Sequence, residues 1–371
     1  MGAKVGIILP HTQEEFGIVS KEQYSNHDGY EHKYANLISD AGEEAIVYYL
    51  HHGKETEEFR HAEGHLCVSV PVDFSLKPGL QFSSILLKRI KKDFEEKKIN
   101  IVHVMGYYPV IYDAIALFCR ACSIPLVAQM HSGRNLSRIV RFPMLFFTLR
   151  LADKVLYVDP DEGRMLKFIF LKGELFPNWV EDDFFDMGLK REKDRFLFVG
   201  NVGNNERMRM KGFDVLLDFF RKYSKRRPLA KLVIVGKIME EQKNAVKEKN
   251  VEFRGTISRK ELAEEYNKAS LTVLPSRFEP FSLAALESIA CGTPSVITRH
   301  FGISKLIPGY ALVLEDADSG KIIDLVESLS ASKWERIKKK GIEFAEMFKK
   351  KKSSEKLISI YASILSRYGI G

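Results

Sequence analysis

The chain has 371 residues, 45% of them hydrophobic, which is enough for two ordinary domains with sizeable cores. Its formal net charge is +8, but no nucleic-acid-binding motif accompanies that charge, so we expect no nucleic-acid partner. No run of residues approaches the roughly 20 apolar residues of a membrane-spanning helix, so we expect no helix of that kind.

The N-terminal residues MGAKVGIILP turn polar too soon for a signal peptide, and we interpret them as a first buried strand. The four cysteines are scattered through the chain. Cys119 and Cys122 lack the second pair that a zinc site would need, and we interpret them as residues of a buried helix face. We therefore expect a cytoplasmic protein with reduced cysteines.

Strand-like and helix-like segments alternate along the first half of the chain, after a long loop that runs to about Asp28. This alternation predicts a parallel sheet with helices on both faces. The predicted strands are Val5–Leu9, Ala45–Leu50, Leu66–Pro71, Ile101–Val104, Pro125–Gln129 and Lys154–Val158, and the predicted helices are Tyr30–Asp40, Phe82–Lys98, Tyr112–Ala121 and Arg141–Leu151.

One stretch of the first half, RNLSRIVRFPMLFFTLRL over residues 134–151, mixes four arginines with methionine and phenylalanines. Such a composition fits a helix that lies in the interface of an anionic membrane. A buried helix with a basic flank explains it as well, so peripheral association with the cytoplasmic face of a membrane is one of two open interpretations. The four residues are Arg134, Arg138, Arg141 and Arg150.

The alternation starts again at Phe196–Gly200, which places a domain boundary near residue 188. We expect an α/β protein with two Rossmann-like domains, one over residues 1–187 and one over 188–350. A last helix is predicted over Ser354–Tyr368. Between the strand Phe196–Gly200 and this last helix, the pattern predicts helices Phe213–Tyr223, Glu240–Lys249 and Ser258–Ala269, and strands Lys231–Val235 and Val251–Phe253.

The most informative stretch, LTVLPSRFEPFSLAALESIACGTPSVIT, runs from Leu271 to Thr298. It predicts a strand over Leu271–Leu274, a helix from about Ser282 to Ala290 that stops at Gly292, and a strand over Ser295–Thr298. This is one βαβ unit. The loop that precedes its helix is where such units bind ligands.

Two glutamates bracket the start of that helix, Glu279 before it and Glu287 within it, with seven residues between them. At 1.5 Å per residue they lie up to about 12 Å apart along the helix axis, roughly the span from hexose to ribose in a nucleotide-sugar. The amides of Phe281, Ser282 and Leu283 would meet the diphosphate at the positive helix end. The alternative is that both glutamates are solvated surface residues.

The pattern EPFSLAALE followed by CGTPSVI resembles the retaining GT-B glycosyltransferases, and most of all their family 4. The resemblance implies two Rossmann-like domains that face each other across a cleft, with the C-terminal segment, residues 351–371, packing back on the first domain. It also implies a nucleotide-sugar co-substrate, no other cofactor and no metal. Two D-x-D sequences, at residues 159–161 and 316–318, are therefore interpreted as loop carboxylates.

The loop from Gly200 and Asn201 to Lys211 resembles the family's V-G-R…K-G pattern, whose arginine and lysine neutralise the leaving diphosphate. Lys211 matches the lysine, but Asn201 stands at the arginine position. Arg207 or Arg209 would then supply the missing charge. The alternative for Lys211 is an ordinary surface lysine.

Residues of the first domain extend the resemblance. His131 ends the stretch PLVAQMH and matches the histidine that the family places beside the transferred sugar. His103 lies at a similar strand end and is a candidate for binding the acceptor, together with Gly29. Gly29 resembles the glycine-rich acceptor loop, where a close approach of the backbone needs a missing side chain. A structural role is the alternative for each of these residues.

The sequence therefore predicts a metal-independent, retaining hexosyltransferase that moves a sugar from an NDP-sugar to an acceptor hydroxyl. Its catalytic residues would be His131, Glu279 and Lys211. The acceptor could be a glycan, a lipid-linked sugar or a small molecule. Two alternatives remain, a non-catalytic scaffold that binds sugar nucleotides or glycans, and a sugar-nucleotide epimerase on the same fold.

Overall fold

The chain divides into two compact units in the computed structural model. Met1–Phe176 and Lys351–Gly371 form the first unit, and Pro177–Lys350 forms the second. The first segment of the first unit thus ends at Phe176, whereas the sequence analysis expected the boundary near residue 188. The structure describes residues 2–18, 20–27, 29–76, 80–131, 144–307 and 309–370.

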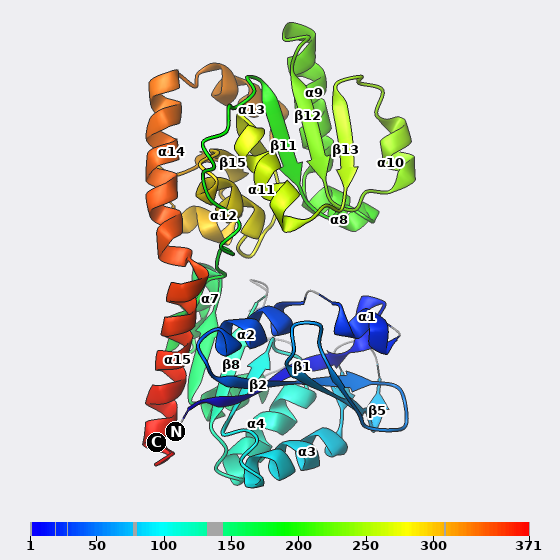
Figure 1. The fold of residues 1–371 in the computed structure, drawn as a ribbon, viewed down its shortest axis with the longest axis vertical. Helices are drawn as coiled ribbons and strands as arrows, with labels where there is room; N and C mark the ends of the chain where they lie inside the picture. Colours follow the sequence, from blue (N-terminus) through cyan, green and yellow to red (C-terminus); the bar gives the residue numbers. More distant parts are fainter. Residues whose placement is uncertain are drawn as a thin grey trace. The chain divides into compact units, whose positions relative to one another are not determined.

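An eight-stranded sheet forms the centre of the first unit, in the order β10-β9-β8-β7-β1-β2-β4-β3. Figure 1 labels its strands β1, β2 and β8. Neighbouring strands are parallel, except that β3 runs antiparallel to β4 at the sheet edge. Chain order reverses at β1, which has β2 and β7 on its two sides. The strands are β1 (Lys4–Thr12), β2 (Glu44–His51), β3 (Glu57–Arg60), β4 (Leu66–Pro71), β7 (Ile101–Met105), β8 (Leu126–Met130), β9 (Lys154–Tyr157) and β10 (Gly173–Leu175), with a separate pair β5 (Phe74–Ser75) and β6 (Gln81–Phe82).

Several helices of the first unit start at a residue whose side chain caps them. The Ser83 hydroxyl accepts the Leu86 amide at the start of α3, and Asp159 with Glu162 forms a capping box on α7. No described helix combines the length and the apolar character that spanning a membrane requires. The helical segments of this part are η1 (Gln13–Phe16), α1 (Lys21–Ser25), α2 (Tyr30–Ser39), α3 (Ser84–Glu95), α4 (Ile111–Ala121), α6 (Met144–Thr148), η2 (Leu149–Leu151) and α7 (Pro160–Phe168).

The C-terminal helix α15 (Lys350–Arg367) packs on the first unit. Its Tyr361 is fully buried, and the hydroxyl lies 2.7 Å from Nδ1 of His103 on β7. The Ser354 hydroxyl donates to the carbonyl oxygen of Leu37 on α2. The last helix of the sequence therefore completes a core that the first part of the chain leaves open.

A six-stranded parallel sheet forms the second unit, in the order β13-β12-β11-β14-β15-β16. Chain order reverses between β11 and β14, which lie side by side. The two sheets confirm the predicted pair of Rossmann-like α/β domains. The strands are β11 (Arg195–Val199), β12 (Lys231–Val235), β13 (Val251–Gly255), β14 (Leu271–Leu274), β15 (Ser295–Thr298) and β16 (Leu312–Leu314).

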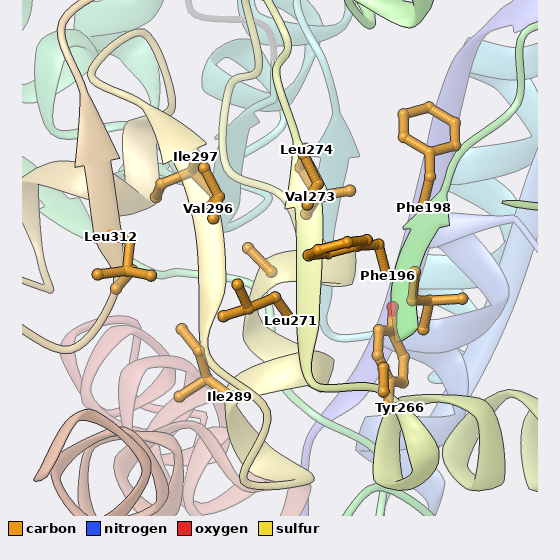
Figure 2. Packing of buried hydrophobic residues seen from close by; sticks show 14 of the residues in the cluster. Phe196, Phe198, Tyr266, Leu271, Val273, Leu274, Ile289, Val296, Ile297 and Leu312 are labelled. Atoms are coloured by element: carbon orange, nitrogen blue, oxygen red, sulfur yellow. The ribbon is translucent and has the colours of Figure 1, made fainter. Parts of the chain in front are cut away.

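Apolar side chains of the middle strands form the second core (Figure 2). Phe196 of β11 and Leu271 of β14 are buried there, and Ile289 of α12 belongs to the same cluster. Strands covered by helices on both faces need such continuous apolar runs. The helical segments are α8 (Asn205–Met210), α9 (Phe213–Arg226), α10 (Glu240–Ala245), α11 (Arg259–Lys268), α12 (Leu283–Ala290), η3 (Gly302–Lys305), α13 (Ser319–Glu327), α14 (Ala331–Ala345) and η4 (Glu346–Phe348).

Several predicted elements differ from the observed ones. The expected N-terminal loop is partly structured, because β1 continues to Thr12 and is followed by η1 and α1. The helix predicted to Lys249 ends at Ala245, since the next residue, Val246, is extended. Of the basic stretch at 134–151, only residues 144–151 belong to the described residues, so Arg134, Arg138 and Arg141 lie outside them.

Candidate active site

The sheet of the second unit brings two distant loops together. Strands β11 and β14 are neighbours, with Phe196 opposite Leu271 and Leu197 opposite Thr272. The loop after each strand therefore leaves from the same edge of the sheet, at the point where chain order reverses. In open α/β sheets this is the position at which ligands bind.

The loop after β11 begins at Gly200, whose carbonyl oxygen lies only 2.3 Å from the position that a Cβ would take on Gly236. The Asn201 side chain accepts the Gly203 amide at 3.0 Å and so holds the turn. A short helix that the sequence analysis did not predict, α8, follows behind Asn204 as its cap.

Both candidate arginines, Arg207 and Arg209, lie on α8 with exposed side chains. The residue that ends this helix is Lys211. The loop therefore carries three cations over five residues, which is what the expected role in neutralising a diphosphate requires.

Gly212 fixes the position of Lys211. Its φ of +64° lies in the left-handed region, and a Cβ at this position would come within 1.9 Å of the Pro275 carbonyl oxygen. Only glycine fits such a conformation without strain. This close approach holds the end of α8 against the loop after β14.

The Lys211 ammonium group forms an ion pair with the Glu279 carboxylate, so two residues that lie 68 positions apart in sequence meet at the sheet edge. The exposed fraction of the side chain is 26% for Lys211 and 18% for Glu279. An ammonium group has three protons to donate, so Lys211 can contact Glu279 and a second anion at the same time.

Backbone contacts hold Glu279 in place. Its amide donates to the His300 carbonyl oxygen at 3.3 Å, and its own carbonyl oxygen accepts the Gly302 amide at 2.9 Å. Two residues before it, Arg277 forms a two-pronged ion pair with Asp214 at 2.8 and 2.7 Å. This ion pair lowers the pKa of the Asp214 carboxyl group and ties the loop to α9.

Helix α12 begins directly after Ser282, as the sequence predicted. The Ser282 hydroxyl accepts the Ala285 amide at 3.2 Å, and the φ of Ser282 is +89°, which is rare for a residue other than glycine. Strained backbone of this kind is concentrated at binding sites. The side chain of the preceding residue, Phe281, is buried in the core, whereas Leu283 is half-buried.

Glu287 lies one turn into α12 and is half-buried. Its Oε2 accepts a hydrogen bond from the hydroxyl of Tyr266 at 3.1 Å. Tyr266 belongs to α11 and is fully buried, and burial together with the Glu287 charge holds the pKa of its hydroxyl well above the usual value. The tyrosine therefore acts as a fixed donor that orients the carboxylate.

In the first unit, His131 directly follows β8 and is half-buried. The Tyr30 ring lies 5.4 Å from the imidazole ring, and burial lowers the pKa of His131 to about 4. The imidazole is therefore neutral near pH 7, so one ring nitrogen can donate a hydrogen bond and the other can accept one. Gly29 caps α2, one residue before Tyr30.

His103 occupies a different environment. It is fully buried on β7, its Nδ1 lies 2.7 Å from the Tyr361 hydroxyl, and burial lowers its pKa to about 3. These contacts are those of a core residue that joins β7 to α15. The acceptor-binding role expected for it finds no support in this geometry.

The D-x-D sequences serve as helix caps and surface pairs. Asp159 caps α7, and Asp318 caps α13 by accepting the Lys321 amide. Asp316 pairs with His300 at 2.9 Å. These contacts agree with the interpretation of these residues as loop carboxylates.

Besides short elements such as α8, the sequence analysis missed three features of the structure. Tyr266 as the donor to Glu287 was missed because α11 gives no sign of which element it packs against. The ion pair between Asp214 and Arg277 was missed because it joins two segments that are 63 residues apart in the sequence. The third feature is a group of buried histidines in the first unit, His32, His61 and His65, which are distant in sequence. The spacing of His61 and His65 was the one local signal for it.

Two family models match consecutive parts of the chain. Glycosyltransferase Family 4 matches residues 32–184, and Glycosyl transferases group 1 matches residues 180–356. The chain belongs to this glycosyltransferase family. Among its curated relatives is mannosylfructose-phosphate synthase of Agrobacterium fabrum, 34% identical over 150 residues, which are 35% of this chain and 33% of that protein.

Solved structures of glycosyltransferases share the fold. Sucrose-phosphate synthase of Thermosynechococcus elongatus superposes with a TM-score of 0.71 at 16% identity, over 98% of this chain and 100% of that one. HepE of Anabaena in complex with UDP and glucose gives a TM-score of 0.67 at 12% identity, over 97% of this chain and 100% of that one. Identities this low show the fold alone, and that fold is the predicted GT-B.

The matched region covers 33% to 58% of the length of the first three curated relatives.

Proposed function

We propose that this protein is a retaining glycosyltransferase that moves a hexose from an NDP-sugar to an acceptor hydroxyl. The observation that carries the proposal is the pairing of Lys211 with Glu279 beside the start of α12. A cation, a helix end and a carboxylate meet there at the edge of the sheet where chain order reverses. A sugar diphosphate needs all three.

The roles follow from the charges. The bond between the anomeric carbon and the diphosphate oxygen breaks, and the diphosphate leaves with the electron pair. Lys211, the amides of Ser282 and Leu283, and Arg207 or Arg209 would stabilise the negative charge that develops on it. Glu279 would hold the hexose hydroxyls. Glu287, oriented by Tyr266, would hold the ribose.

His131 would contact the transferred sugar, and the loop at Gly29 would contact the acceptor. The acceptor oxygen would form the new bond to the anomeric carbon on the face from which the diphosphate departs, and its proton would pass to the departing diphosphate oxygen. Because the proposed cations come from the protein, we propose that transfer needs no metal ion at the diphosphate. The complex of HepE with UDP and glucose supports a nucleotide donor, and uridine nucleotides are the first to test.

The test is a panel of UDP-, GDP- and ADP-sugars, with binding measured by thermal shift and transfer measured by release of the nucleoside diphosphate. A donor at about one hundred times its Kd should add about 2.7 kcal/mol of stability. NMR of the product would show whether the anomeric configuration is kept. If none of these donors binds, the proposal is wrong.

The same panel separates the two alternatives. A scaffold would bind the donor without turnover, an outcome to which the replacement of the family's arginine by Asn201 lends some weight. An epimerase would change the sugar in the absence of an acceptor. Either result would replace the transferase assignment.

We further propose that the first unit touches an anionic membrane surface. Four large apolar side chains are exposed near the end of α7 and on α6, with exposed fractions from 54% to 91%. Arg150 links the two helices, since its guanidinium group donates to the carbonyl oxygens of Phe146 and Ile169. Exposed apolar residues beside cations suit a membrane interface. The four are Met144, Phe147, Phe168 and Phe170.

Sedimentation with vesicles that contain anionic lipid tests this second proposal. Phe170→Ser and Phe168→Ser should release the protein from the vesicles, whereas Leu229→Ser, at an exposed apolar residue of the second unit, should not. Equal binding by all variants and the wild type would refute it.

A further inference from the structure

Three histidines from separate parts of the first unit converge in its interior. His32 lies on α2, and His61 and His65 flank the turn between β3 and β4. All three are buried, with exposed fractions of 1%, 7% and 8%. One ring nitrogen of each lies within 4.8 Å of one ring nitrogen of the other two.

The turn between β3 and β4 sets two of these rings side by side. The His61 amide donates to the His65 carbonyl oxygen at 3.0 Å, and Gly64, with a φ of +98°, permits the tight return of the chain. The rings of His61 and His65 are nearly parallel, with centroids 4.6 Å apart. The His32 ring stacks on that of His61 at 3.8 Å.

Neighbouring groups fix how the rings are turned. The Tyr49 hydroxyl lies 2.7 Å from His32 Nε2, and His32 Nδ1 faces His65 Nε2 at 2.7 Å. His61 Nε2 lies 3.1 Å from the carbonyl oxygen of His27. Metal-bound imidazoles use such outer contacts, in which the nitrogen that does not bind the metal donates to an oxygen.

The charge state of the group suits a metal. Desolvation lowers the pKa of His32 to about 2 and that of His65 to about 4, so these imidazoles are neutral near pH 7. Neutral imidazole is the form that binds metal ions.

We propose that His32, His61 and His65 bind one transition-metal ion, Zn²⁺ in the first instance, which fastens α2 to the turn between β3 and β4. Three imidazoles without a thiolate suit zinc, and water would take the fourth position. Tetrahedral bonds of about 2.0–2.1 Å would place the nitrogens roughly 3.3 Å apart. His32 and His65 would therefore separate slightly, and coordination through His61 Nδ1 would replace its contact with the Glu63 amide.

The ion would have a structural role. β3 is a four-residue edge strand, and α2 begins at the proposed acceptor loop, so both elements gain from a cross-link. No step of sugar transfer involves the ion. The proposal therefore stands whether or not the protein is a transferase, and it replaces the expectation from the sequence that the chain binds no metal.

The experiment uses the full chain without an affinity tag and measures its metal content after dialysis against zinc. We expect about one equivalent of zinc per chain, bound at a site closed enough to survive gel filtration. Cobalt in place of zinc should give the strong visible absorption of a tetrahedral ion. A chelator should lower the thermal unfolding temperature, and added zinc should restore it.

The matched variants are His65→Gln and His52→Gln, the second at an exposed histidine outside the group. His65→Gln should lose the zinc and the cobalt absorption, whereas His52→Gln should keep both. If His65→Gln does not fold, the wild-type stoichiometry and cobalt spectrum decide alone. A wild type that retains no zinc, or a His65→Gln variant that retains as much as the wild type, would overturn the proposal.

Discussion

Tyr266→Phe is the change that best separates the binding site from the fold that carries it. It removes one oxygen atom from a fully buried side chain, together with the hydrogen bond of 3.1 Å to Glu287. A hydrogen bond to a charged group contributes about 1.5–3 kcal/mol. Since Glu287 is half-buried and water can replace part of the contact, we expect a loss near the lower end, about 1.5 kcal/mol.

That loss translates into two measurable effects. The second unit runs from Pro177 to Lys350, and for a domain of this size 1.5 kcal/mol lowers the unfolding temperature by about 3–6 °C. Without the hydrogen bond from Tyr266, the Glu287 carboxylate should turn more freely and, in its proposed role, hold the ribose less well. We expect the Kd for the nucleotide to rise about fivefold, which corresponds to about 1 kcal/mol.

Tyr223→Phe provides the matched control. Tyr223 is also a buried tyrosine of the second unit, and its hydroxyl donates to Asp194 at 2.8 Å. Its replacement should lower the unfolding temperature by a similar amount and leave the Kd unchanged. An equal change of the Kd in both variants, or wild-type nucleotide binding by Tyr266→Phe, would show that Tyr266 does not orient Glu287 for the nucleotide.

Three further changes test other parts of the structure. Lys211→Ala should lower kcat about 10²-fold or more in the transfer assay, because it removes the cation proposed to stabilise the departing diphosphate. Lys211→Arg should recover part of the lost kcat. Gly212→Ala should destabilise the second unit by at least about 1–2 kcal/mol in thermal unfolding, since φ is +64° and Pro275 blocks the new Cβ. His103 titrates at about 3 when folded and near 6.5 when unfolded, so its contribution to stability is complete above pH 6.5 and is lost as the pH falls toward 3. The slope is about 1.4 kcal/mol per pH unit, and acid unfolding followed by circular dichroism should be less steep for His103→Gln.

Local signals predicted the focal βαβ unit well. The strands Leu271–Leu274 and Ser295–Thr298 were predicted with the observed bounds, because apolar β-branched runs end at proline, serine and threonine. Gly292, with a φ of +71°, follows α12 as expected, and Ser282 caps it. Each of these signals lies within a few residues of the feature that it predicts.

The features that were missed depend on contacts between distant residues. Short elements such as α8 and β3 have too few residues for a periodic pattern, and their neighbours hold them in place. The His32 group requires a helix and a turn that meet only in the folded sheet. His103 resembled a site residue because it belongs to a strand, and Tyr361, far along the chain, gives it a different environment.

The return of α15 to the first unit has a consequence for synthesis on the ribosome. The first unit is interrupted at Phe176 and resumes only at Lys351, so the second unit is an insertion within it. All residues of the second unit leave the exit tunnel before Tyr361 is available to close the core of the first. The second unit can therefore fold before the first. Until the last helix has been synthesised, the first unit exposes apolar surface that chaperones can bind.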